Sequence, residues 1–127
     1  MKKYQFLEHT ADVKFRAFGK TPKEVFQNAA LAFISILHDE KIKKNKKKKF
    51  VVRGNDLEAL MFRFLEEVLF LFETKGFLIS KIKVTFGKDK KSLKAEVFGE
   101  EKLSKRVRHY VKAVTYNDMF VKNIKGV

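Results

Sequence analysis

Alternating hydrophobic and polar residues near the N-terminus predict two short β-strands. The first covers residues 3–7 and the second covers residues 12–19. In the second stretch, hydrophobic side chains alternate with charged ones along most of its length. This period of two is typical of a strand with one face against the core and the other in solvent. The chain is therefore expected to open with two strands joined by a tight turn.

The pattern changes to a helical period after this second strand. Thr21 is placed to cap a helix, Pro22 suits its first position, and Glu24 completes a capping box. We expect this helix to end near His38. Hydrophobic residues recur along it at spacings of three and four, which makes one buried stripe. The stripe consists of Phe26, Ala29, Ala30, Phe33, Ile34 and Leu37.

A second, longer helix is predicted between residues 56 and 74. Asn55 and Asp56 offer a cap at its start, and Gly76 is a common residue just beyond a helix end. Its hydrophobic residues cover a broad face, and further ones lie outside that face: Phe62, Leu69 and Phe70. One sheet face alone does not require so much apolar surface. We therefore expect the helix to pack on both the sheet and the first helix, or to present an edge to a partner.

The remaining hydrophobic stretches predict five further strands. They are expected at residues 50–54, 77–86, 93–98, 110–116 and 119–121, with polar loops at residues 39–49 and 99–108. No internal repeat or linker interrupts the chain, which predicts a single domain over residues 1–127. The order of elements favours an α+β fold: a two-layer sandwich with two helices packed on one face of a mixed, mostly antiparallel sheet.

Composition narrows the class of protein. Hydrophobic residues make up 45% of the chain, which is typical of a globular domain, and cysteine is absent. Disulfides, thiolate zinc sites and cysteine nucleophiles are therefore excluded. No hydrophobic run approaches the roughly 20 residues that a membrane span requires, and the N-terminus does not resemble a signal peptide. We expect a cytoplasmic protein with no membrane partner.

Charge is the most unusual bulk property of the sequence. The formal net charge is +14, and seven lysines fall between Lys41 and Lys49. Such a balance favours attraction to RNA, to an RNA-bound partner or to anionic lipid. A lysine run is also commonly a solvated loop. This run contains no aromatic residue, glycine or arginine, so it gives no sign of base recognition.

The densest group of chemically capable residues lies between the first two predicted strands, at residues 8–12. Asp12 offers a carboxylate, which is a ligand that Mg²⁺ and Ca²⁺ prefer. The alternative is that Asp12 caps the turn by accepting hydrogen bonds from backbone N–H groups. His9 is a poorer ligand for such ions, and we expect it to order the turn through hydrogen bonds.

Enzyme signatures are absent from the sequence. His9, His38 and His109 do not share a metal-ligand spacing, and no glycine-rich phosphate loop is present. Glu66 and Glu67 are adjacent on the long helix, where neighbouring side chains point about 100° apart. They are therefore expected to be a solvated pair. A second basic cluster near residues 105–109 could contact phosphate or form an ordinary solvated loop.

Six motifs, in order along nearly the whole chain, together resemble the archease family. They are EHTADV at residues 8–13, AFGKT at 17–21, NAA at 28–30, DLEAL at 56–60, FLEEVLFLF at 64–72 and VKAVTY at 111–116. The resemblance implies a compact α+β domain that assists tRNA splicing. Members of this family activate an RtcB-type RNA ligase. They promote guanylylation of the ligase's active-site histidine and so support multiple turnover. The chain is then expected to be an accessory protein, not an enzyme. The alternative is a basic tRNA-binding module, or a chaperone-like modulator of tRNA modification.

The resemblance also implies a divalent metal site. In the family, an Asp that matches Asp12 binds a cation seen as calcium, and the other ligands come from the extreme C-terminus. The sequence departs from the family pattern there, because it ends at Val127 without the expected strand and its terminal Asp. The metal site, for Ca²⁺ or Mg²⁺, is therefore assigned to Asp12 and the free carboxylate of Val127, with Asp118 as an alternative. Two further departures are Asn117 in place of a His and Phe64 in place of a Trp.

Overall fold

Seven secondary-structure elements make up the described part of the chain. The computed structural model describes residues 2–7, 14–38, 41–43 and 45–102. The elements are, in order, β1 (Tyr4–Leu7), β2 (Lys14–Ala17), α1 (Pro22–Leu37), β3 (Lys46–Arg53), α2 (Leu57–Lys75), β4 (Phe77–Phe86) and β5 (Ser92–Glu101). Both helices and five of the predicted strands are thus confirmed. The strands predicted at residues 110–116 and 119–121 lie outside the described residues.

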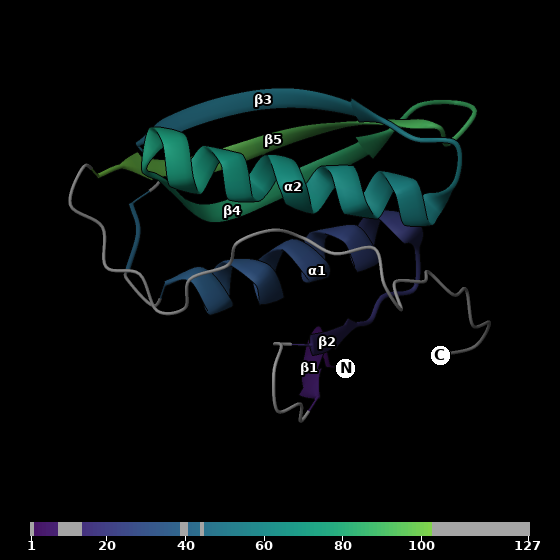
Figure 1. Cartoon of the computed structure of the whole chain (residues 1–127), viewed down its shortest axis with the longest axis horizontal. Helices are drawn as coiled ribbons and strands as arrows, with labels where there is room; N and C mark the ends of the chain where they lie inside the picture. Colours follow the sequence, from purple (N-terminus) through teal and green to yellow (C-terminus); the bar gives the residue numbers. More distant parts are fainter. Residues whose placement is uncertain (1, 8–13, 39–40, 44, 103–127) are drawn as a thin grey trace.

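The described strands form two antiparallel sheets. β1 pairs with β2, and the larger sheet has the order β3-β5-β4. In Figure 1 α1 lies between the β1–β2 hairpin and the larger sheet, against which α2 also packs. The predicted α+β class, with two helices on antiparallel sheets, is confirmed. Among the described strands the smaller sheet is separate from the larger one, and Ala17 of β2 packs on the core that α1 shares with β4.

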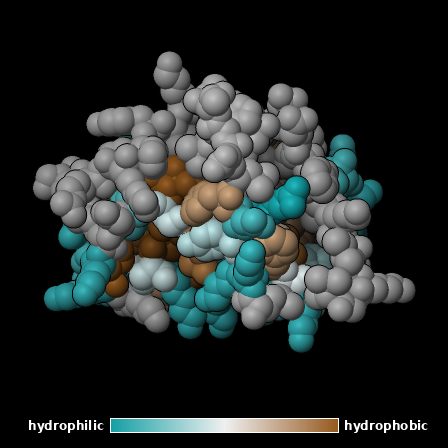
Figure 2. Space-filling model, turned by 90° about the horizontal axis from the view of Figure 1, so that it is seen from below, coloured by the Kyte–Doolittle hydropathy of each residue, from teal (hydrophilic) through white to brown (hydrophobic). Residues whose placement is uncertain are grey.

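The side of the molecule that carries the hairpin is not uniformly polar. Figure 2 shows this side, with hydrophobic side chains visible near its centre and hydrophilic ones around them. The side-chain amide of Asn28 on α1 donates to the carbonyl of Phe18 at 2.7 Å, which ties the chain after β2 to the helix. A buried polar group stabilises a fold when it is paired in this way. The hairpin is therefore fixed to α1 by both apolar contact and a hydrogen bond.

Each helix begins with the same local arrangement. Thr21 Oγ1 accepts a hydrogen bond from the backbone N–H of Glu24 at 3.2 Å, and Asp56 Oδ1 accepts one from Ala59 at 2.7 Å. A glycine stands two residues before each cap. A Cβ on Gly19 or on Gly54 would lie 2.7 Å from a backbone nitrogen of the helix that follows. The strand can turn this tightly into the helix only because glycine lacks that atom.

The core lies between the two helices and the larger sheet. Phe26 of α1 and Phe64 of α2 are both fully buried, with ring centroids 5.7 Å apart. The ring of Phe86 on β4 lies 5.1 Å from that of Phe26. The predicted stripe of α1 is buried as expected, at Phe26, Ala29, Ala30, Phe33, Ile34 and Leu37. Aromatic packing therefore joins both helices to the sheet without tryptophan.

The lysine run is the main departure from the predicted elements. Residues 39–49 were expected to form a loop, but β3 begins at Lys46. Similarly, β5 continues to Glu101, beyond the predicted end at residue 98. The added residues of β3 pair with the second half of β5, with Lys46 opposite Gly99 and Lys49 opposite Glu96. Lysine has little intrinsic preference for strands, so cross-strand pairing with β5 and its carboxylates has overridden local propensity here.

No helix in the described part of the chain is long and apolar enough to cross a membrane.

Candidate functional site

The predicted metal ligands lie outside the described residues. Asp12, Asp118 and Val127 all fall in segments that the structure does not describe, as do His9 and His109. The strands that flank Asp12 are described, however. Leu7 of β1 lies opposite Lys14 of β2, so residues 8–13 form the link of an antiparallel hairpin. The prediction that this stretch joins two strands is confirmed, and its metal chemistry stays a prediction.

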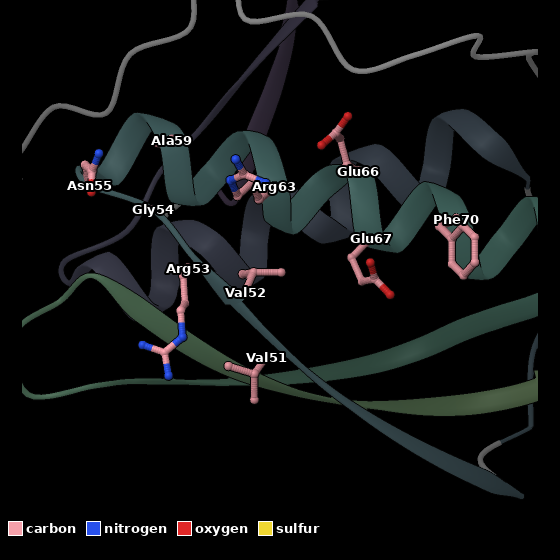
Figure 3. A pocket seen from close by; sticks show the side chains of 10 residues that line it. All are labelled: Val51, Val52, Arg53, Gly54, Asn55, Ala59, Arg63, Glu66, Glu67 and Phe70. Atoms are coloured by element: carbon pink, nitrogen blue, oxygen red, sulfur yellow. The ribbon is translucent and has the colours of Figure 1, made fainter.

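No group of three or more His, Cys, Asp or Glu side chains able to hold a metal occurs among residues 2–7, 14–38, 41–43 and 45–102. His38 follows α1 and is buried, and its ring stacks on that of Phe72 with centroids 5.8 Å apart. Glu66 and Glu67 point in different directions from α2 in Figure 3, as expected for adjacent helical residues. The described residues therefore offer no second candidate for a metal site or a paired acid and base.

A groove of about 930 Å³ lies between β3 and α2 (Figure 3). Two of its lining residues are large hydrophobic side chains that remain exposed: Val51 at 60% and Phe70 at 50%. Four charged residues also line it: Arg53, Arg63, Glu66 and Glu67. Phe70 was one of the residues outside the predicted buried face of the long helix, and the structure places it at the surface as a candidate edge for a partner.

Several features of this groove suit contact with a protein. Its lining contains no Ser, Thr, Cys or His, and its titratable side chains are those of Arg53, Arg63, Glu66 and Glu67. β3 is the outer strand of its sheet, and outer strands present unpaired backbone groups to which another chain can pair. Exposed apolar side chains gathered at one place are also typical of interaction sites.

A different surface covers the side of the larger sheet that faces away from the helices. We call this surface the outer face. On β3, Phe50 and Val52 pack toward the core, which directs the alternate residues outward. The strand register brings these residues beside outward ones of β5 and β4, and all six basic residues among them are exposed. The basic residues of the outer face are Lys47, Lys49, Arg53, Lys81, Lys83 and Lys94.

Neighbouring lysines lower the pKa values of two carboxylates of β5, Glu96 and Glu101. Desolvation acts to raise the pKa of Glu96, but Lys47, Lys49 and Lys83 outweigh it and hold that pKa below its ordinary value. Lys47 Nζ lies 3.5 Å from Glu96 Oε2. On the other side of β5, a hydrogen bond from Lys48 and the charge of Lys46 lower the pKa of Glu101. The lysine run therefore places positive charge on both sides of the sheet, and it is not a single basic loop.

Comparison with known proteins identifies the family. The model of the family described as "Archease protein family (MTH1598/TM1083)" matches residues 4–127. The chain belongs to the archease family. It is 38% identical to the protein archease of Methanosarcina mazei, over 98% of this chain and 90% of that protein. It is 40% identical to the protein archease of Pyrobaculum islandicum, over 95% of this chain and 86% of that protein.

A solved structure agrees with this assignment. The solution structure of Methanobacterium thermoautotrophicum protein 1598 is similar with a TM-score of 0.83 and 32% sequence identity, covering 99% of this chain and 93% of that one. The family resemblance drawn from the motifs is thus confirmed for this archease, together with its fold.

The outer face does not follow from sequence reasoning alone. Its signal is present in β5, where Lys94, Glu96 and Phe98 alternate with buried residues. The lysines of β3 give no such signal in the sequence. Lys46–Lys49 has the composition of a loop, in which the direction of the side chains cannot be predicted.

Proposed function

We propose that this archease is an accessory protein in tRNA splicing that activates an RtcB-type RNA ligase. It promotes guanylylation of the ligase's active-site histidine and so sustains multiple turnover. The observation that carries this proposal is the family match over nearly the whole chain.

The proposal includes a divalent cation, Ca²⁺ or Mg²⁺, held by oxygen atoms of Asp12 and Val127 or of Asp12 and Asp118. These groups supply hard oxygen ligands, which both ions prefer. Support comes from the hairpin link in which Asp12 lies and from the lack of another metal-binding cluster among the described residues. Direct titration with Ca²⁺, followed by calorimetry, tests this site without a ligase. We expect Asp12→Ala to abolish binding, and unchanged binding would contradict the assignment.

The groove between β3 and α2 is the proposed contact surface for the ligase. Val51 and Phe70 are two of the three large hydrophobic side chains exposed within the described residues, and both line this groove. Buried aromatic anchors surrounded by charged residues are typical of energetically important positions in protein interfaces. The charges of Arg63 and Glu67 at its walls would then fix the orientation of the partner.

Turnover of the cognate ligase is the decisive measurement. With substrate in large excess, the ligase alone should stop after about one turnover, and added archease should restore continued ligation. Asp12→Ala should remove most of this stimulation while circular dichroism stays unchanged. Glu73→Ala is the control, because Glu73 is an exposed carboxylate on α2. If the ligase's turnover number is the same with and without the archease, the proposed function is wrong.

A further inference from the structure

The outer face concentrates positive charge on three neighbouring strands. Across the sheet, Lys47 and Lys81 lie on either side of Phe98, and Lys49 and Lys83 lie on either side of Glu96. Neighbouring strands are about 4.8 Å apart, and alternate residues along a strand about 6.7 Å apart. The face carries six basic residues but only two outward carboxylates of β5, Glu96 and Glu100. The result is a two-dimensional basic grid, not a single charged strand edge.

Protection of the sheet edges accounts for only part of this grid. Lysines on an outer strand commonly prevent unwanted pairing with another chain, which explains Lys47 and Lys49 on β3 and also Lys81 and Lys83 on β4, the other outer strand of the described sheet. Lys94, however, lies on β5, the central strand, where no edge needs protection. Ion pairing does not account for the basic grid either. Among the described residues of this face, its one ion pair joins Lys47 to Glu96. Most of its charge is therefore left without a neutralising partner within the described residues.

An aromatic ring lies within the basic grid. Phe98 is on the central strand and only partly buried. The ammonium groups of Lys47 and Lys81 lie over this ring, at 5.9 and 5.8 Å from its centroid. Both lysines have flexible side chains that can move aside to phosphates while a planar base takes their place on the ring. Aromatic side chains on an open sheet face, flanked by basic residues, are a recurring platform for single-stranded RNA.

We propose that the outer face binds single-stranded RNA, with phosphates on the lysine rows and a base stacked on Phe98. An acidic protein is the competing occupant, but protein interfaces are depleted in lysine, and five of the six basic residues here are lysines. This binding goes beyond activation of a ligase and does not depend on it. A chain that fails to stimulate the ligase can still bind RNA through this face.

Fluorescence anisotropy with a labelled single-stranded RNA of about ten nucleotides tests the proposal. The outer-face variant combines Lys49→Gln, Lys83→Gln and Lys94→Gln. We expect its affinity at moderate salt to fall about tenfold or more, and the slope of log K against log salt to shrink by about 2, at roughly 0.7 for each phosphate that is no longer neutralised. The matched control combines Lys20→Gln, Lys23→Gln and Lys75→Gln, which removes the same charge from exposed positions outside the lysine run and the outer face. It should change affinity by less than about twofold.

The aromatic platform is tested separately with Phe98→Leu, which keeps an apolar side chain but removes the flat ring. We expect about a fivefold loss of affinity with no change in the salt slope, because stacking is not electrostatic. Circular dichroism and thermal unfolding verify that each variant is folded. Equal losses in the outer-face and control variants would overturn the proposal, since net charge alone would then explain binding. So would tighter binding of a labelled polyglutamate peptide than of RNA.

Discussion

The groove and the outer face share strand β3 but differ in chemistry. The groove gathers the exposed side chains of Val51 and Phe70, with arginines and glutamates around them. The outer face gathers lysines on every strand and keeps its one aromatic ring beneath ammonium groups. Val51 lies at the border, because it is an outward residue of β3 that also lines the groove.

The difference indicates two kinds of partner for one sheet. Exposed apolar surface with mixed charge contributes to affinity through burial, which falls little with added salt. A surface of like charge contributes through long-range attraction and release of counterions, which falls steeply with salt. The two proposals therefore assign a protein partner to the groove side of β3 and RNA to its outer side. The following predictions test the core that supports both surfaces and then each surface separately.

Phe64→Ala should have the largest effect, and it should not distinguish the two surfaces. Phe64 is fully buried, and its ring lies 6.1 Å from that of Phe50, a residue of β3 that packs against the core. Truncating a buried phenylalanine typically costs about 3–5 kcal/mol of unfolding free energy. Urea denaturation followed by circular dichroism measures this loss. Phe70→Ala, at an exposed position of the same helix, should cost less than about 1 kcal/mol, and a similar loss in both variants would contradict the assigned core.

The buried part of this fold is also the part that sequence predicts best. The helical period and the caps at Thr21 and Asp56 are enough to define both helices from the sequence. Gly76 ends α2 as expected, with φ of 59°. Local signals suffice here because capping and burial act over a few residues. The division of the strands between two sheets was not predicted, since it depends on which strands meet across α1.

The candidate surfaces are much harder to predict. Lys46–Lys49 has the local character of a solvated loop, and only its pairing with β5 reveals that alternate lysines face opposite sides. Phe98 falls within a predicted strand, but nothing in the sequence places it between Lys47 and Lys81. Long-range register cannot be read from local composition. The metal ligands Asp12 and Val127, predicted from the resemblance, lie outside the described residues, so they stay predictions.

Phe70→Glu is expected to separate the surfaces most clearly. Placing a charge at the exposed apolar position of the groove should weaken ligase binding by about 2 kcal/mol, which is roughly thirtyfold, because aromatic anchors dominate interface energy. Pull-down and calorimetry with the cognate ligase measure this effect. RNA affinity should change little, since Phe70 is not on the outer face. The outer-face lysine variant should show the reverse pattern, and parallel losses in both assays would mean that the two surfaces act as one.

Asp56→Ala should have a smaller effect, which is confined to the stability of the helix that lines the groove. Asp56 caps α2 next to Asn55, which lines the end of the groove. Loss of an N-cap typically costs about 1 kcal/mol. Thermal unfolding should show this loss, and hydrogen exchange should rise in the first turn of α2 more than in β5. Asp56→Ser, which retains a capping oxygen, should restore most of the stability, whereas failure of this rescue would indicate that Asp56 acts in another way.

Glu96→Gln should have the smallest effect on stability, and it tests the role of charge on the outer face. The pKa of Glu96 is lowered in the folded state, so its ionised form stabilises the fold above its ordinary pKa of 4.5. That contribution is lost as pH falls through the lower, folded-state pKa. The variant should therefore show a flatter dependence of unfolding free energy on pH below 4.5 than the parent.

RNA binding by Glu96→Gln should change in the opposite direction from that of the lysine variants. The substitution removes a carboxylate that lies beside Lys47 and in the field of Lys49 and Lys83. Affinity for single-stranded RNA at neutral pH should then rise, because these lysines no longer share their charge with Glu96. Glu73→Gln, an exposed position on α2, is the control with the same charge change. If both variants raise RNA affinity equally, only net charge matters and the outer face has no special role; a rise confined to Glu96→Gln assigns the binding to this side of β5.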